Sequence, residues 1–298
     1  PYTEDIRVRF RIDGDLTEIM RLPKSNLSAI VTRIKIIGRM NIAEKRLPQD
    51  GRVETSIDGR EIDMRISSLP TIYGEKLVIR LLDKSSFNFT KEKLGFSEHN
   101  LELFNNILKQ PYGMFLATGP TGSGKTTTLY TVLRELNTVD KNVITIEDPV
   151  EYKLEGINQV QVNVKAGLTF ASGLRSILRQ DPDIIMIGEI RDNETAEIAV
   201  RAAITGHLVL STLHTNDSPS TIARLIDMGI EPYIVSSAVV GIVSQRLVKV
   251  LCPKCKEKYS ATYDEKKMLG VDVGQDLELY RPVGCNACNA GYRGRMAA

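Results

Sequence analysis

The chain begins with a stretch in which apolar and cationic side chains alternate, as in a strand with one buried face. Residues 6–12 read Ile-Arg-Val-Arg-Phe-Arg-Ile and are followed by Asp13-Gly14, which predicts a strand that ends in a tight turn. Further along, we expect Ser25 to cap a helix, because apolar residues then recur at helical spacing as far as Gly38. The chain therefore opens with a hairpin and an amphipathic helix.

A second hairpin pattern follows this helix. Residues 52–57 and 60–67 are strand-like and are separated by Asp-Gly, and residues 76–82 form another strand-like run. The pattern over residues 1–83 predicts a small α+β domain with an antiparallel sheet.

The hydrophobic pattern changes after residues 84–98, a polar stretch without strand periodicity that we interpret as a linker. Short apolar runs then alternate with helical segments, at residues 114–118, 143–146, 183–187 and 208–213. Such alternation is typical of βαβ units on a parallel sheet, and helix starts are visible at Asp192-Asn193 and Asp217-Ser218-Pro219. We therefore predict an α/β domain over residues 99–249 and a separate C-terminal region over residues 250–298.

Composition and charge narrow the class of protein. Hydrophobic residues make up 42% of the 298 residues and charged residues 26%, which is typical of a globular chain. A formal net charge of +2 excludes binding to nucleic acid or anionic lipid by bulk attraction. The uncharged run 232–245 is shorter than the roughly 20 residues of a membrane-spanning helix, so we expect no transmembrane segment. Because Pro1 leads almost directly into a strand, we expect a piece of a longer protein.

One motif predicts a phosphate-binding loop. Residues 119–126 read Gly-Pro-Thr-Gly-Ser-Gly-Lys-Thr, which matches G-x-x-x-x-G-K-[ST] between an apolar strand and a helical segment. The backbone N–H groups of such a loop surround a phosphate, Lys125 reaches its β- and γ-oxygens, and Thr126 can ligate Mg²⁺. The predicted nucleotide-binding residues are Gly119, Pro120, Thr121, Gly122, Ser123, Gly124, Lys125, Thr126 and Thr127.

Two acidic residues follow predicted strands of the same sheet. Glu147, next to Asp148, ends the run 143–146, and Glu189 follows the run 183–187 after Gly188. A nucleotide hydrolase needs carboxylates at this edge to hold Mg²⁺ and to orient the attacking water. Because Gly188 occupies the usual place of the acid, the residues alone leave open which carboxylate serves the metal.

The three histidines differ in their expected roles. His207 and His214 flank the run 208–213, and an isolated histidine at a strand end is more often structural. We expect His214 to lie at the edge where phosphate-facing groups collect and to sense the γ-phosphate. His99, in the polar stretch, is expected to be solvated.

All four cysteines form two Cys-x-x-Cys pairs in the C-terminal region. Cys252 and Cys255 are separated from Cys285 and Cys288 by 29 residues. Two such pairs predict one structural Zn²⁺ with four thiolate ligands in a reducing compartment, and the alternative is a set of free or disulfide-bonded thiols.

Taken together, the motifs resemble the hexameric ATPases of type II secretion and type IV pilus assembly. In the family's order, the matching segments are 119–126 (Walker A), 144–152 (aspartate box), 178–192 (Walker B, with the same Gly-Glu ending) and 205–217 (histidine box). Segments 8–14, 47–52, 63–65 and 74–80 resemble the family's second N-terminal domain, a PAS-like module. The resemblance thus implies a PAS-like domain followed by a RecA-like ATPase domain with a tetracysteine zinc insertion.

What this resemblance implies is a motor that binds ATP, Mg²⁺ and Zn²⁺. Six chains would form a ring in which domain rotation drives pilin-like assembly on an inner-membrane platform protein, from the cytoplasmic side. Glu147 would be the general base, and Glu189 would organise Mg²⁺ through water. Arg65 and Arg80 match arginines that the family uses in phosphate contact, although strand spacing alone favours ion pairs with nearby acids. By the same resemblance, the family's first N-terminal domain is missing, and the chain stops at Ala298 inside the C-terminal region.

Other functions stay open at this point. A pilus-retraction ATPase belongs to the same family, but by the resemblance its members lack the tetracysteine insertion. A nucleic-acid motor shares the P-loop, yet no stretch here combines aromatic and basic residues in the manner of a nucleic-acid-binding segment. A nucleotide-gated binding module without turnover would keep Lys125 and lose the acids, whereas Glu147 and Glu189 are both present.

Overall fold

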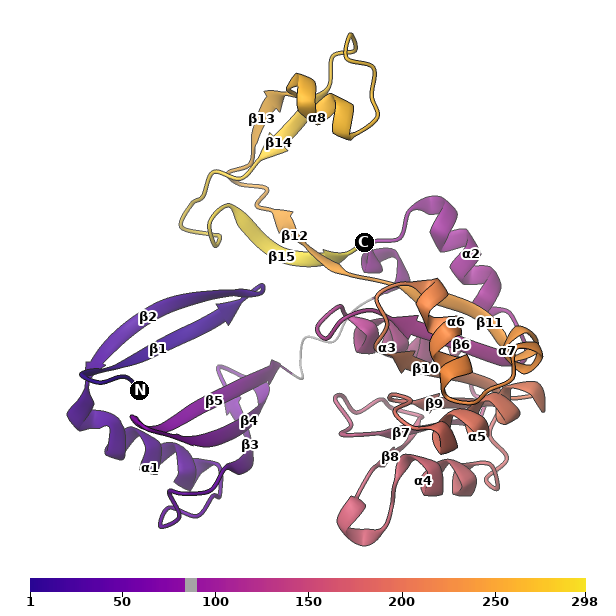
Figure 1. Ribbon diagram of the computed structural model, residues 1–298, viewed down its shortest axis with the longest axis horizontal. Coiled ribbons are helices and arrows are strands. Elements are labelled where there is room, and N and C mark those ends of the chain that lie inside the picture. Colours follow the sequence, from indigo (N-terminus) through magenta and orange to yellow (C-terminus); the bar gives the residue numbers. More distant parts are fainter. Residues whose placement is uncertain (84–89) are drawn as a thin grey trace. The chain divides into compact units, whose positions relative to one another are not determined.

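The computed structural model describes residues 1–83 and 90–298. The chain divides into two compact units, residues 1–88 and 89–298 (Figure 1). Residues 84–89, the first part of the predicted linker, lie outside the described residues.

The first unit contains the helix and the antiparallel strands that the sequence predicts. Its elements are β1 (Asp5–Ile12), β2 (Asp15–Pro23), η1 (Lys24–Asn26), α1 (Leu27–Ile37), β3 (Gln49–Ile57), β4 (Arg60–Thr71) and β5 (Gly74–Asp83). Strands β1 and β2 form a hairpin, and β3, β4 and β5 form a three-stranded antiparallel sheet in chain order. The pattern therefore predicted β1, β3, β4 and β5, although β3 begins earlier and β4 ends later than expected, and β2 was implied only by the turn at Asp13-Gly14.

Helix α1 differs from the prediction at its start. Ser25 lies in η1 and does not cap the helix, whose N-cap is Asn26 without a side-chain hydrogen bond. The helix buries Lys35, which forms an ion pair with Glu75 of β5 and donates to the carbonyl of Glu44 at 2.7 Å. A buried ammonium needs such partners, because an unpaired charge away from water is very costly.

The second unit is built on a six-stranded parallel sheet with the order β11-β6-β10-β9-β7-β8. The strands are β6 (Gly113–Thr118), β7 (Val143–Glu147), β8 (Asn158–Gln161), β9 (Ile184–Ile187), β10 (Leu208–Leu213) and β11 (Val239–Ser244). The helices are α2 (Glu98–Leu108), α3 (Lys125–Leu136), α4 (Phe170–Ile177), α5 (Asn193–Ile204), α6 (Ser218–Asp227) and α7 (Pro232–Ala238), with short 3-10 turns η3 (Lys91–Leu94) and η4 (Val164–Ala166). The predicted parallel α/β arrangement is thus present.

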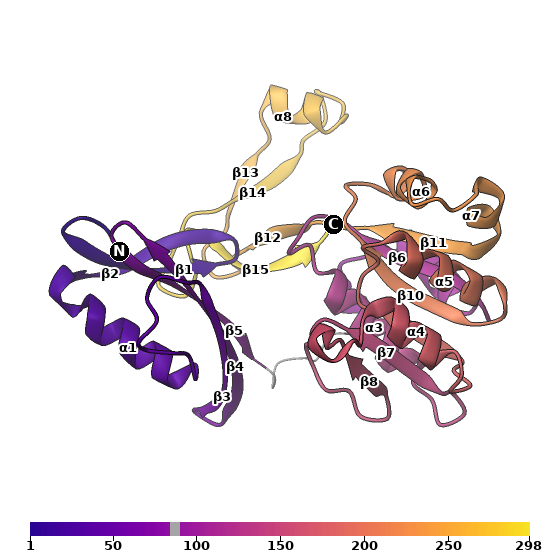
Figure 2. The ribbon, with the colours of Figure 1, turned by 60° about the horizontal axis from the view of Figure 1, so that its bottom comes forward.

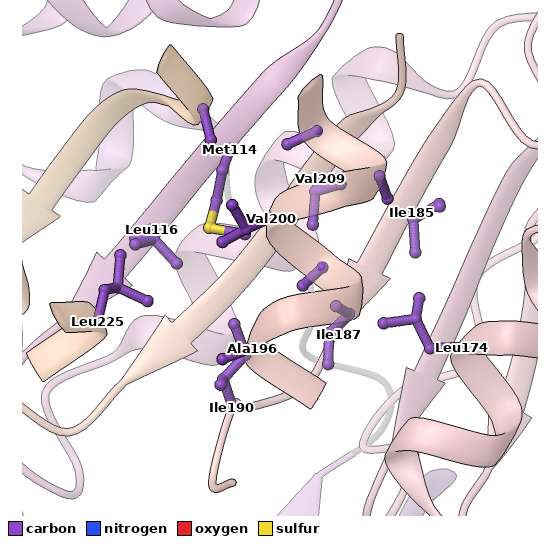
Figure 3. Packing of buried hydrophobic residues seen from close by; sticks show 14 of the residues in the cluster. Met114, Leu116, Leu174, Ile185, Ile187, Ile190, Ala196, Val200, Val209 and Leu225 are labelled. Carbon is purple, nitrogen blue, oxygen red and sulfur yellow. The ribbon is translucent and has the colours of Figure 1, made fainter. Parts of the chain in front are cut away.

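Helices pack on both faces of this sheet. Side chains from α4, α5, α6 and α7 join Met114, Leu116 and Ile185 in one buried cluster (Figure 3). Phe115 alternates with Met114 and Leu116 and therefore faces the other side, where its ring contacts Phe104 of α2 with centroids 5.6 Å apart. The centre of the sheet is consequently buried on both faces, which explains why β6, β7, β9 and β10 are apolar runs without alternation.

The described part of the predicted linker is more ordered than its sequence suggests. Ser97 caps α2 by accepting a hydrogen bond from the backbone N–H of Asn100 at 3.3 Å. His99 therefore lies in the first turn of α2 and not in a linker. Polar composition hid this helix, because only its buried residues Phe104 and Leu108 carry the helical spacing.

The C-terminal region of the second unit contains two antiparallel pairs of strands, one nested inside the other in chain order. Strand β12 (Leu247–Leu251) pairs with β15 (Tyr292–Ala297), and β13 (Glu257–Ser260) pairs with β14 (Glu278–Arg281). Helix α8 (Tyr263–Met268) lies between β13 and β14 in the chain, and this lobe extends away from the parallel sheet (Figure 2). Among the described residues, no helix combines the length and hydropathy needed to cross a bilayer.

Candidate nucleotide site

The predicted phosphate loop forms a tight turn between β6 and α3. Gly119 and Gly124 have φ of +140° and +90°, a backbone conformation that favours glycine. A Cβ at Gly119 would lie 2.3 Å from the carbonyl oxygen of Gln245, so this close approach also requires glycine. The loop thus presents its backbone at the N-terminus of α3, where the helix dipole favours an anion.

Lys125 folds back over this loop. Its Nζ donates to the carbonyl oxygens of Gly119 at 2.8 Å and Pro120 at 3.1 Å. Burial lowers the pKa of Lys125, and the negative charge of Glu189 partly offsets this effect. In the described part of the chain, the hydroxyl of Ser123 is buried without a hydrogen-bond partner. A buried cation beside an unpaired hydroxyl in a glycine loop fits a phosphate group.

Glu147 is held inside the protein at the end of β7. It is 3% exposed; one carboxylate oxygen accepts from Thr145 at 2.6 Å and from Gln159 at 3.1 Å, and the other accepts from the hydroxyl of Tyr130. Burial raises the pKa of Glu147, although these three hydrogen bonds favour the ionised form. A carboxylate with a raised pKa and fixed orientation suits a general base.

Glu189 lies beside Arg191 and His214. Its carboxylate contacts Arg191 and accepts from Nε2 of His214 at 3.3 Å, while Nδ1 of the same imidazole lies 3.5 Å from Nζ of Lys125. Burial acts to raise the pKa of Glu189, but the hydrogen bonds and charges of Arg191 and His214 hold it below the usual value. The lowered pKa favours the ionised form of Glu189, and its negative charge acts on Lys125.

These groups line one open cavity of about 410 Å³ at the carboxyl edge of the sheet. Its lining includes the predicted residues Lys125, Thr126, Glu147, Glu189 and His214. His207 belongs elsewhere, because its Nδ1 lies 3.0 Å from the carbonyl oxygen of Ala202 at the opposite end of β10. Predicted residues from four separate segments of the chain thus meet in one place.

Sequence reasoning missed two residues that shape this site. Gln245, just after β11, donates from Nε2 to the carbonyl oxygen of Ser123 at 2.7 Å and accepts from Thr128 at 2.8 Å. Tyr130 contacts Glu147 from α3. Each is a polar side chain inside an apolar stretch, which is the signal that could have drawn attention to them.

The two predicted arginines lie in the first unit. Arg65 of β4 and Arg80 of β5 are directly opposite each other, and Arg52 of β3 is opposite Arg65 on its other side. Directly opposed residues share a face, so three guanidinium groups form a row. The carboxylate of Asp63 is fully buried between them, at 2.8 Å from Arg52 and 3.8 Å from Arg65, whereas Arg80 is exposed.

The four cysteines come together between the two nested strand pairs. Their sulfur atoms all lie within 4.8 Å of one another, and none forms a disulfide. Cys255 and Cys288 have sulfurs 3.6 Å apart, and the backbone N–H of Cys285 donates to the sulfur of Cys288 at 3.2 Å. A tetrahedral Zn²⁺ with bonds of about 2.3 Å separates its sulfur ligands by about 3.8 Å, so the cluster fits this ion.

Comparison with known sequences adds two groups of relatives. The chain is 56% identical over 290 residues to type II secretion system protein E of Pseudomonas aeruginosa, covering 97% of this chain and 58% of that protein. It is 55% identical over 303 residues to the type IV pilus assembly ATPase PilB of Myxococcus xanthus, covering 100% of this chain and 53% of that protein. The chain thus spans somewhat more than half the length of these relatives.

Solved structures share the fold. The pilus retraction motor PilT with bound ADP has a TM-score of 0.60 at 29% identity, over 93% of this chain and 78% of PilT. The ATPase DotB of Legionella pneumophila has a TM-score of 0.64 at 25% identity, over 83% of this chain and 73% of DotB. A model of the family described as Type II/IV secretion system protein matches residues 1–298. The chain therefore belongs to the Type II/IV secretion system protein family.

Proposed function

We propose that this chain is the ATP-hydrolysing region of a motor that drives assembly of type IV pili or type II secretion pseudopili. The observation that carries the proposal is the pocket in which the phosphate loop, two carboxylates and a histidine meet. The names of relatives that are more than half identical to the chain support the same function. Release of phosphate from ATP by the purified chain in the presence of Mg²⁺ tests it, and the absence of release would contradict it.

The predicted residues of the pocket have distinct proposed roles. Lys125 and the loop amides bind the β- and γ-phosphates, and Glu147 accepts a proton from the attacking water. Mg²⁺, when bound, neutralises phosphate charge; Thr126 would ligate it and Glu189 would hold it through water. His214 contacts both Glu189 and Lys125 and would sense the γ-phosphate.

Sequence identity to the relatives decides how we rank pilus assembly, type II secretion and pilus retraction as functions. Secretion and pilus-assembly relatives are 56% and 55% identical, so identity does not separate these two cargoes. The retraction motor PilT matches at 29%, and we therefore place pilus retraction second. We further propose a homo-hexamer in which a PAS-like first unit rotates against the RecA-like second unit, bound to an inner-membrane platform protein on the cytoplasmic side.

We also propose that Arg65 and Arg80 neutralise charge on the γ-phosphate. Arg52, Arg65 and Arg80 stand opposite one another across three strands, with Arg52 paired to Asp63 and Glu54 and Arg65 near Asp63. Adjacent guanidinium groups on one sheet face suit a phosphate, because each presents several N–H donors to its oxygens. An arginine that contacts the transition state contributes roughly 10³ to 10⁵ in rate. An exposed ion pair contributes under about 1 kcal/mol to stability.

Replacement of Arg65 or Arg80 by Ala is therefore expected to lower ATP turnover at least about a hundredfold with little loss of thermal stability. Phosphate release and melting temperature measure the two effects. Arg60→Ala is a matched control, because Arg60 begins the same strand β4, is 70% exposed and lies 3.9 Å from Asp83. Near-normal turnover in both variants would indicate instead that Arg65 and Arg80 only pair with acidic residues of neighbouring strands.

The cysteine cluster is proposed to bind one structural Zn²⁺. Four thiolates complete a tetrahedral site and leave no position for substrate, so the ion would stabilise the lobe and not act in hydrolysis. It would join the two nested strand pairs, which lack a large core of their own.

Removal of this ion by a chelator is expected to unfold residues 250–290 before the parallel sheet. The reason is that structural zinc contributes on the order of 10 kcal/mol to local folding. Hydrogen exchange should report the loss of protection, and native mass spectrometry should find one zinc per chain. Cys285→Ser should lose the metal, whereas Asn286→Ser in the same loop should retain it. A freshly purified, reduced sample without metal would refute the site.

A further inference from the structure

Tyr130 occupies an unusual position for a tyrosine. It is 0% exposed in α3, five residues after Lys125, and its hydroxyl donates to the carboxylate of Glu147. The same hydroxyl accepts from the backbone N–H of Glu151 at 3.1 Å and of Tyr152 at 3.4 Å. A phenol has one donor and two acceptor sites, so these contacts use its full hydrogen-bonding capacity.

The ring of Tyr130 is fixed as firmly as its hydroxyl. It packs edge to face against the ring of Tyr152, with centroids 5.7 Å apart. The hydroxyl therefore ties together three segments: the helix that begins at Lys125, the end of β7, and the loop that follows it. Because buried hydroxyl groups pay a large penalty when unpaired, this arrangement strongly favours one position of the carboxylate.

We propose that Tyr130 is a positioning residue that holds Glu147 in place and in its ionised form for proton abstraction from water. The proposal rests on the proposed role of Glu147 as the base. A hydrogen bond donated to a carboxylate stabilises its charged form, which is the form that accepts a proton. Tyr130 lines the pocket beside Glu147, and its proposed effect on hydrolysis is exerted through that carboxylate.

Replacement of Tyr130 by Phe tests the proposal, because the ring remains and only the hydroxyl is lost. We expect kcat for ATP to fall about tenfold or more, since a hydrogen bond to a charged group is lost, while KM stays within about twofold. The acid limb of the pH–rate profile should move to higher pH, because the pKa of Glu147 rises when a donor to its charged form is removed. The charged or titratable groups that share the pocket with Glu147 are Lys125, Asp148, Glu151, Glu189, His214 and Arg295, and they are unchanged in the variant.

A second substitution covers the case in which Tyr130→Phe folds poorly. Incorporation of 3-fluorotyrosine at position 130 keeps the shape and both kinds of hydrogen bond but makes the phenol a stronger donor. The acid limb should then move to lower pH. If Tyr130 had only a structural role, its replacement would change the melting temperature, and neither variant would shift the acid limb of the pH–rate profile.

Two comparison variants separate the possible failures. Leu133→Val removes buried volume from the same helix, and we expect a lower melting temperature with near-normal kcat below it. Normal kcat and an unshifted acid limb in Tyr130→Phe, together with loss of turnover in Glu147→Gln, would overturn the positioning role alone. Normal turnover in Glu147→Gln would instead show that Glu147 is not the general base. The proposed role of Tyr130 would then be excluded as well.

Discussion

Replacement of Lys125 by Ala is expected to lower ATP hydrolysis at least about a thousandfold, because the loop loses the cation that neutralises the transferring phosphoryl group. Lys125 donates to Gly119 and Pro120 of its own loop and approaches His214 at the edge of the pocket. Lys125 lines the pocket and does not belong to the buried apolar cluster, so we expect the core to stay packed when its side chain is shortened. We expect circular dichroism and the melting temperature to change little while phosphate release falls to background.

A matched lysine variant controls for the loss of charge as such. Lys141, before β7, is 45% exposed and lies 3.8 Å from Asp183, outside the pocket. Lys141→Ala should hydrolyse ATP at nearly the normal rate. Turnover by Lys125→Ala within a few-fold of normal would exclude the phosphate loop as the reactive site.

Replacement of Glu147 by Gln is expected to trap ATP in the pocket. The amide keeps the size of the carboxylate but cannot accept a proton, and general base catalysis typically contributes about 10² to 10⁴ in rate. Turnover should fall at least about a hundredfold while ATP affinity stays nearly normal, because Lys125 and the loop are intact. A single-turnover experiment that separates bound ATP from bound ADP measures this directly.

Glu189→Gln is the natural comparison for this experiment. Glu189 lies next to Arg191 and His214. Because Glu189 is proposed to hold Mg²⁺ through water, we expect its replacement to raise the Mg²⁺ concentration needed for turnover. If Glu147→Gln turned over ATP normally and Glu189→Gln retained unhydrolysed ATP, the two roles would have to be exchanged. The raised pKa of Glu147 and the lowered pKa of Glu189 support the present assignment.

The parallel sheet was largely predictable because its central strands are buried on both faces. Strands β6, β7, β9 and β10 are apolar runs bounded by helix starts, and those patterns are local. Strand β8 escaped prediction because Asn-Gln-Val-Gln at the sheet edge has a polar composition. Strand β11 escaped because α7 and β11 adjoin in one apolar run, within which periodicity cannot separate helix from strand.

The residues of the candidate site likewise include some that the sequence predicts and some that it does not. The phosphate loop and the strand-end acids follow from local sequence, since a glycine motif and a strand terminus place their residues without reference to distant contacts. Gln245 does not, because it lies 117 residues from Thr128 and 122 from Ser123 along the chain. Tyr130 has a helical, apolar-looking context, and only the folded chain brings its hydroxyl to Glu147 at the end of β7. A polar side chain inside an apolar stretch marks such a residue as unusual, but the local sequence does not show which distant residue it contacts.

The most direct test of the account is the steady-state rate of phosphate release from Mg²⁺-ATP, measured for the purified chain and for Lys125→Ala over a wide range of protein concentrations. We predict hydrolysis by the unmodified chain, with a rate per chain that rises with concentration as the proposed ring assembles, and background release by the variant. An unmodified chain that binds ATP but releases no phosphate at any concentration, with or without the platform protein, would contradict the proposal that it is a motor.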